Sequence, residues 1–187
     1  MRILVLSTIV LAVLADIHWG GCPKIDYELE SFDAAQYMGR WYEVARSSSI
    51  PFEHGECSEA NYRILETGDV GVENTEVING VRNSVKGTAY ANKSNPFQFG
   101  LDFGGFMDKF IKGDYQVVNT DYTGFTVVYS CTNLYVARSE WIWILTRTPQ
   151  LDAQAFTNLK TYIADKLKFP VDAYTYSNQD PTFCKRN

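Results

Sequence analysis

Two stretches begin and end the β-rich part of this chain: GRWYEVAR at residues 39–46 and WILTR at residues 143–147. The first predicts a glycine turn leading into a strand that begins with a large aromatic residue. The second predicts an alternating strand that ends in arginine. We expect the two strands to close one end of a β-barrel, with the Arg147 guanidinium stacked on the Trp41 indole. Such a cation–π contact is worth about 1–2 kcal/mol when it is desolvated.

Short β-rich runs alternate with turn signals between these two stretches, which is the pattern of an antiparallel barrel. Asn79-Gly80 is a strong signal for a tight hairpin, because both residues accept a positive φ. Eight strands enclose a space just wide enough for one small ligand. The sequence therefore predicts an all-β fold, an eight-stranded antiparallel up-and-down barrel. Its strands are expected near residues 41–47, 57–65, 70–78, 82–91, 96–103, 114–121, 124–132 and 140–147.

A C-terminal α-helix is predicted after the last strand. Thr148 can cap its first turn, Pro149 suits its first position, and Pro170 ends it. A membrane or partner helix would need a more basic face, so we expect the helix to pack outside the barrel wall. Its apolar stripe consists of Phe156, Leu159, Ile163 and Leu167.

Residues 1–15 are predicted to be a secretory signal peptide, because a charged start is followed by an apolar run too short to span a bilayer. A buried N-terminal helix or strand is the alternative. A lipidated Cys22 is disfavoured, because Trp19 occupies the position where lipoproteins usually carry leucine. Residues 16–187 suit a single domain, and no further run of membrane length follows, so a membrane-spanning protein is not expected.

Charge and cysteine content narrow the class of protein. The net charge is −5 at pH 7, which disfavours nucleic acid and anionic membranes as partners. Four cysteines in a secreted chain imply two disulfides with three alternative connectivities. No Cys-x-x-Cys spacing occurs, so a zinc or redox site is not expected, and no metal ligands are predicted.

Three segments carry a family resemblance: Gly39-x-Trp41, Thr120-Asp121-Tyr122 and the terminal Arg147, in that order. With them the chain resembles the lipocalin family, in the group that includes apolipoprotein D, bilin-binding proteins and crustacyanins. The resemblance implies a calycin barrel closed by Gly39, Trp41, Asp121 and Arg147. It also implies the disulfides Cys22–Cys131 and Cys57–Cys184.

Strand parity predicts which side chains face the barrel interior, because successive residues point to opposite faces. An inward Arg147 places Trp141 and Trp143 inside, with Ile142 and Ile144 outside beneath the helix. Glu43 could be inward and pair with a ligand amine or take a proton; a satisfied or solvated carboxylate is the other interpretation. The predicted ligand-binding residues are Glu43, Ala60, Tyr62, Val85, Gly87, Phe97, Phe99, Trp141 and Trp143.

Four loops are expected to frame the open end of the barrel: residues 47–56, 74–83, 92–96 and 135–140. Asn92-Lys93-Ser94 is an N-glycosylation sequon on a predicted hairpin tip. The apolar residues 104–110 could form a hydrophobic lip or a self-association patch, which would make a homo-oligomer.

The sequence is thus interpreted as a secreted carrier that binds a small hydrophobic ligand in the barrel. The resemblance implies a bilin, carotenoid, retinoid, steroid or fatty acid, and no required cofactor. A pigment-complex or self-associating protein is one alternative. An enzyme is the other, but neither His18 nor His54 stands beside a serine or cysteine in a recognisable spacing, so no catalytic residue is predicted.

Overall fold

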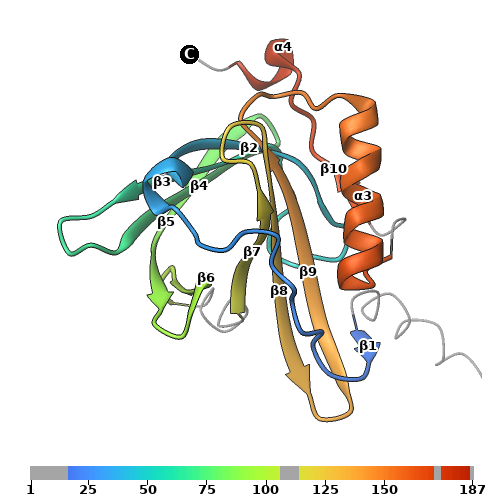
Figure 1. The fold of residues 1–187 in the computed structure, drawn as a ribbon. Coiled ribbons are helices and arrows are strands. Elements are labelled where there is room, and N and C mark those ends of the chain that lie inside the picture. Colours follow the sequence, from blue (N-terminus) through green and yellow to red (C-terminus); the bar gives the residue numbers. More distant parts are fainter. Residues whose placement is uncertain (1–16, 106–113, 171–173, 186–187) are drawn as a thin grey trace, which may run out of the picture.

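An antiparallel sheet dominates the computed structural model, which describes residues 17–105, 114–170 and 174–185. Each strand pairs with the next, and the last pairs with the first, so eight strands close into a barrel (Figure 1). The predicted eight-stranded antiparallel barrel is confirmed. Its strands are β2 (Gly39–Ser47), β3 (Glu56–Ile64), β4 (Val70–Ile78), β5 (Val81–Asn92), β6 (Asn95–Asp102), β7 (Asp114–Thr120), β8 (Phe125–Leu134) and β9 (Ala137–Thr146).

Two short strands that were not predicted extend the sheet. β1 (Ile17–Trp19) pairs with the start of β9, and β10 (Tyr174–Tyr176) pairs with the end of β2. Three residues are too few to show a strand pattern, so tertiary pairing alone forms them. The predicted signal peptide, residues 1–15, and most of the apolar segment 104–110 lie outside the described residues.

Helix α3 (Ala153–Leu167) packs outside the barrel, as predicted, but it begins later than predicted. The cap is Asp152, whose carboxylate accepts the backbone N–H groups of Gln154 and Ala155. The hydroxyl of Thr148, which was expected to cap the helix, instead donates to the carbonyl of Gln150 at 2.8 Å. The prediction was wrong because a local hydrogen bond already uses the Thr148 side chain.

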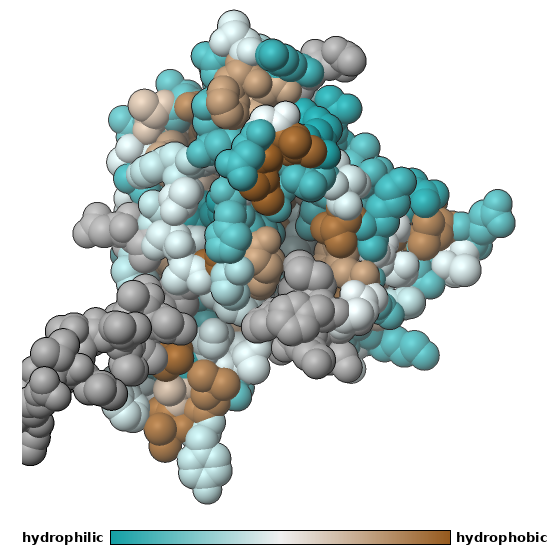
Figure 2. Space-filling model, turned by 180° about the vertical axis from the view of Figure 1, so that it is seen from behind, coloured by the Kyte–Doolittle hydropathy of each residue, from teal (hydrophilic) through white to brown (hydrophobic). Residues whose placement is uncertain are grey.

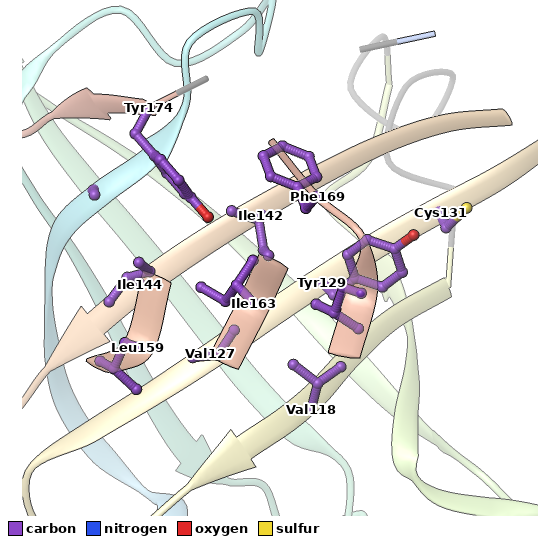
Figure 3. Packing of buried hydrophobic residues seen from close by; sticks show 12 residues of the cluster. Val118, Val127, Tyr129, Cys131, Ile142, Ile144, Leu159, Ile163, Phe169 and Tyr174 are labelled. Carbon is purple, nitrogen blue, oxygen red and sulfur yellow. The ribbon is translucent and has the colours of Figure 1, made fainter. Parts of the chain in front are cut away.

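The outer core lies between α3 and the barrel wall (Figure 3). Leu159 and Ile163 project from the helix toward Val127, Ile142 and Ile144 on β8 and β9. These side chains are buried, and full burial of each is worth about 1.5–3 kcal/mol. The predicted outward orientation of Ile142 and Ile144 beneath the helix is confirmed.

Both disulfides implied by the resemblance are present, Cys22–Cys131 and Cys57–Cys184. The first attaches the N-terminal segment to β8. The second attaches the short helix α4 (Pro181–Cys184) to the start of β3. Each bond joins residues more than a hundred positions apart, so it restricts the unfolded chain strongly.

The face turned to the viewer in Figure 2 is mostly hydrophilic, with hydrophobic residues in separate patches. The described part of the chain holds no helix with the length and apolar character needed to cross a membrane.

Candidate ligand-binding site

Arg147 and Trp41 close one end of the barrel. The guanidinium carbon of Arg147 lies 3.7 Å from the centroid of the fully buried Trp41 ring. The same guanidinium donates hydrogen bonds to the carbonyls of Tyr122, Arg40 and Gln36, each at 2.9 Å. The barrel is therefore sealed at the end where β2 begins and β9 finishes.

Two further predicted closure residues shape the same end. Gly39 has a φ of +93°, and a Cβ there would lie 3.4 Å from Nη1 of Arg147. The Asp121 carboxylate accepts the backbone N–H groups of Thr123, Gly124 and Phe125, which fixes the β7–β8 turn. Gly39 thus makes room for the arginine, and Asp121 holds the neighbouring turn in place.

The N-terminal segment and helix α1 (Ala34–Tyr37) pack against this closed end. Phe32 packs edge-on against Phe97 and Phe99, with ring centroids 6.2 and 5.3 Å away. Tyr27 stacks on Phe97 at 4.4 Å. Phe97 and Phe99 were predicted to bind ligand, but they do not line the cavity; parity gives the face of a residue and not its depth in the barrel.

The Asn92–Pro96 turn was also placed at the wrong end. β5 finishes and β6 begins at the closed end, where Asn95 donates a hydrogen bond to the Tyr27 hydroxyl at 2.8 Å. Asn92 is exposed, and its side-chain amide oxygen accepts the backbone N–H of Ser94 at 2.8 Å. The sequon therefore lies on an exposed turn, and its glycosylation stays a prediction.

A cavity of about 180 Å³ occupies the other half of the barrel interior. Six of the nine predicted ligand-binding residues line it: Glu43, Ala60, Tyr62, Val85, Trp141 and Trp143. Its other apolar lining comes from Phe52, Leu101, Phe103, Tyr115 and Leu145, and its other polar lining from Glu53, Ser58, Glu59, Asn74, Thr75, Glu76, Asn83, Ser84 and Ser130.

Gly87 was predicted to bind ligand, but it does not line the cavity. A Cβ at this position would lie 2.5 Å from the carbonyl oxygen of Asp102 and 2.6 Å from Cδ1 of Phe103. The small residue therefore accommodates the end of β6, and Phe103 lines the cavity in its place.

Two indole rings form the aromatic wall of the cavity. Trp141 packs edge-on against Phe52, with ring centroids 5.6 Å apart. The ring N–H of Trp143 donates to Oε2 of Glu53 at 2.8 Å. Phe52 and Glu53 belong to the β2–β3 loop, whose inward fold no periodic pattern could reveal. Sequence reasoning therefore missed both residues.

Tyrosines form the end of the cavity nearest the closed end. The hydroxyls of Tyr62 and Tyr115 are 2.7 Å apart, and the Tyr37 ring lies 5.4 Å from that of Tyr62. Burial raises the pKa of Tyr62 to about 12 and raises the pKa of Tyr115 as well. Both hydroxyls are thus neutral at pH 7 and can donate or accept a hydrogen bond. Alternation on β7 was the signal that could have found Tyr115.

Charged residues gather on another side of the cavity. Nη1 of Arg46 lies 2.5 Å from Oε1 of the buried Glu43. Nη2 of Arg46 donates to the carbonyls of Glu53 and Gly55, at 3.2 Å each, and so holds the loop over the barrel. Glu43 is inward, as expected, and it is satisfied by Arg46.

Burial, together with the nearby Glu43 carboxylate, raises the pKa of Glu53 to about 8. The Trp143 N–H and Arg46 act in the opposite direction. Glu53 thus titrates near neutral pH. No group of three potential metal-binding side chains comes together within residues 17–105, 114–170 and 174–185.

Comparisons with known proteins agree with this geometry. Residues 32–176 match the family model described as a lipocalin-like domain. Apolipoprotein D of Mus musculus is 36% identical, with 78% of this chain and 76% of that protein covered. The bilin-binding protein of Pieris brassicae is 28% identical over the whole of both chains.

Solved structures show the same fold. Lobster apocrustacyanin A1 superposes with a TM-score of 0.77 at 17% identity, covering 89% of this chain and 93% of that one. Insecticyanin from the tobacco hornworm Manduca sexta superposes with a TM-score of 0.72 at 18% identity, covering 90% and 91%. The family-model match and the identity to apolipoprotein D establish that this chain belongs to the lipocalin family.

Proposed function

We propose that this protein is a secreted carrier that binds a small hydrophobic ligand in the barrel cavity. The observation that carries the proposal is the cavity itself, closed at one end by Trp41 and Arg147 and walled by Trp141, Trp143 and Tyr62. Apolar ligand surface removed from water there gains about 25 cal/mol per Å². The tyrosine hydroxyls and the glutamates can orient a polar end of the ligand.

The size of the cavity favours a compact ligand. Its volume of about 180 Å³ is below the roughly 300–1,000 Å³ of pockets for drug-sized molecules. Among the predicted ligand classes, a bilin or carotenoid would require the cavity to widen. A small aromatic or aliphatic compound fits without that change.

Secretion is supported by the two disulfides, since such bonds persist in oxidising compartments. N-glycosylation at Asn92 is proposed as well, because a secreted chain passes the glycosylation machinery and this sequon lies on an exposed turn.

Binding without catalysis is the function we propose. All four cysteines are in disulfides, so no thiol is available as a nucleophile. The imidazole of His54 is exposed and hydrogen-bonds the Pro51 carbonyl at 2.9 Å.

The test begins with an absorption spectrum of protein from its native source and mass spectrometry of its organic extract. We expect a small hydrophobic compound in the extract, and saturable binding of the neutral probe N-phenylnaphthylamine after its removal. Ala60→Trp would fill the cavity and abolish probe binding, whereas Lys86→Trp, on the outward face of β5, would preserve it. An empty protein that binds no probe would overturn the proposal.

A further inference from the structure

The cavity has an excess of negative charge. Its lining contains four glutamates, while no lysine, arginine or histidine of the described residues lines it. Glu59 is compensated by Arg40, with 3.6 Å between Nε and Oε2. The other three are Glu43, Glu53 and Glu76, and the guanidinium that faces them is that of Arg46.

Most hydrogen-bond donors of the Arg46 guanidinium already have partners within the protein. Arg46 is paired with Glu43 and donates its second amino group to two loop carbonyls. Glu76 accepts the Gly55 N–H at 2.6 Å. Glu53 receives a hydrogen bond from the neutral indole of Trp143 and interacts with the Glu43 carboxylate. Two carboxyl groups can share a hydrogen bond only if one of them carries a proton. Among the described residues neither Glu53 nor Glu76 forms an ion pair, and Glu53 is the one of the two whose carboxylate reaches the Trp143 indole in the aromatic wall.

Unpartnered polar atoms in the same cavity wall point independently to a ligand. The Ser58 hydroxyl oxygen and the amide oxygen of Asn74 are buried without a hydrogen-bond partner, and both residues line the cavity. Ser58 is only 8% exposed. A buried polar atom left unpaired destabilises the folded protein, and a ligand that pairs with it removes that cost. An amide oxygen can be satisfied only by a donor, and an ammonium group offers three of them.

We propose that the cavity selects ligands in which a protonated amine is attached to a compact aromatic or aliphatic body, with Glu53 as the counterion. This inference rests on the proposed carrier function. The ligand body would lie against Trp141 and Trp143, and the ammonium N–H groups would face Glu53 and the Asn74 amide oxygen. The neutral tyrosines at the far end of the cavity carry no charge that would repel the ligand.

The amine would replace the proton that Glu53 carries in the free protein. The groups that face Glu53 are Glu43 and Arg46 on β2, Glu76 on β4 and Trp143 on β9, with Tyr62 on β3 close enough to be affected by its charge. Since burial raises the pKa of Glu53 to about 8, binding of a permanent cation at neutral pH would release a proton. Affinity for that cation would rise as the pH increases from 6 toward 9.

The experiment is isothermal titration calorimetry at pH 7.5 with three matched probes: phenylbutylamine, phenylbutanol and phenylbutyrate. We expect the amine to bind about tenfold or more tightly than the alcohol, the ratio that about 1.4 kcal/mol of charge interaction gives. The carboxylate should bind most weakly. Phenylbutyl-trimethylammonium, whose charge is independent of pH, then tests the predicted rise in affinity and the proton release.

Glu53→Gln is the decisive variant, because it keeps the size of the side chain and removes its charge. The amine-to-alcohol affinity ratio should fall to about that of a neutral site, roughly one to two. Glu73→Gln is the matched control; Glu73 lies on β4 outside the cavity, pairs with Lys86 at 3.5 Å, and its replacement should leave the ratio unchanged.

The outcomes separate the two proposals. Equal binding of amine and alcohol, tighter binding of the carboxylate, or an unchanged ratio in Glu53→Gln would overturn the amine preference while the carrier function stands. Absence of binding by all three probes, together with binding of N-phenylnaphthylamine, would also overturn the amine preference alone. If N-phenylnaphthylamine also did not bind, both the amine preference and the carrier function would be overturned.

Discussion

The guanidinium of Arg147 stacks on the indole of Trp41, with 3.7 Å between its central carbon and the ring centroid. The two residues lie more than a hundred positions apart in the chain, at the end of β9 and near the start of β2. Their contact joins the last strand of the barrel to the first. It also brings the arginine N–H groups to carbonyls of the β7–β8 turn and of helix α1.

Replacement of Arg147 by alanine is expected to lower the free energy of unfolding by about 2–4 kcal/mol. The cation–π contact accounts for about 1–2 kcal/mol, and the carbonyls left without donors account for the remainder. Urea unfolding followed by fluorescence measures the change. Lys86→Ala, at an exposed ion pair on β5, is the control and should change stability by less than about 0.5 kcal/mol. A loss for Arg147→Ala as small as that of the control would contradict the structural role.

Each disulfide is expected to contribute about 4–5 kcal/mol in the chain-entropy model, because the cysteines are 109 and 127 residues apart. The variants Cys22→Ser/Cys131→Ser and Cys57→Ser/Cys184→Ser should therefore unfold at much lower urea concentration than the wild type. Alkylation of the unreduced protein followed by mass spectrometry provides the control. Any added alkyl group would show a free thiol and contradict the observed pairing.

Helix α3 offers a direct test of the corrected cap. Asp152→Ala removes the acceptor for the N–H groups of Gln154 and Ala155, so stability should fall by about 1 kcal/mol. Thr148→Ala removes the residue that the sequence favoured as the cap, and it should have the smaller effect in the same thermal-unfolding measurement. A larger loss of stability for Thr148→Ala than for Asp152→Ala would support Thr148 as the cap.

Glu140 is a buried carboxylate outside the ligand cavity. It is fully buried, lies 3.0 Å from Nε of Arg138 and 3.6 Å from Nε2 of His18, and accepts a hydrogen bond from the Tyr129 hydroxyl. Glu140→Gln should lower the free energy of unfolding by about 3 kcal/mol, since the arginine loses its partner. Tyr129→Phe, which removes one hydrogen bond, should cost about 1 kcal/mol. A Glu140→Gln protein as stable as the wild type would show that the pair adds nothing.

Stability should depend on pH through Glu53. Its pKa is raised from 4.5 to about 8 in the folded protein, mainly by burial. A raised pKa favours the protonated form in the folded state, so this contribution is complete below pH 4.5 and is lost as the pH rises through 8. Glu53→Gln cannot lose a proton.

The variant should therefore gain stability relative to the wild type between pH 5 and pH 9. Urea unfolding at both pH values measures the difference. Glu73→Gln is the control, and its stability difference from the wild type should be the same at both pH values. The hydrogen bond from Ser84 lowers the pKa of Glu73, so this carboxylate stays ionised over the whole range. A constant difference for Glu53→Gln as well would contradict the assigned pKa.

Local patterns predicted much of the fold. Alternation and turn residues gave the eight strands, and the parity set by Arg147 placed Trp141 and Trp143 inside and Ile142 and Ile144 beneath the helix. The start of α3 was wrong, since propensity cannot show that the Thr148 hydroxyl bonds Gln150. β1 and β10 were missed because they exist only through pairing with β9 and β2.

The order of residues was enough to predict the barrel, its closure by Trp41 and Arg147, and the inward face of most strands. These features follow from periodicity and from residue chemistry that acts within a strand or a turn. The depth of each residue in the barrel depends on the packing of distant segments, and this packing places Phe97 and Phe99 outside the cavity. It also folded the β2–β3 loop inward and brought Glu53 to Trp143 and Glu43. The chemistry of the site depends on this arrangement, because burial and neighbouring charge, which exist only after folding, raise the pKa of Glu53.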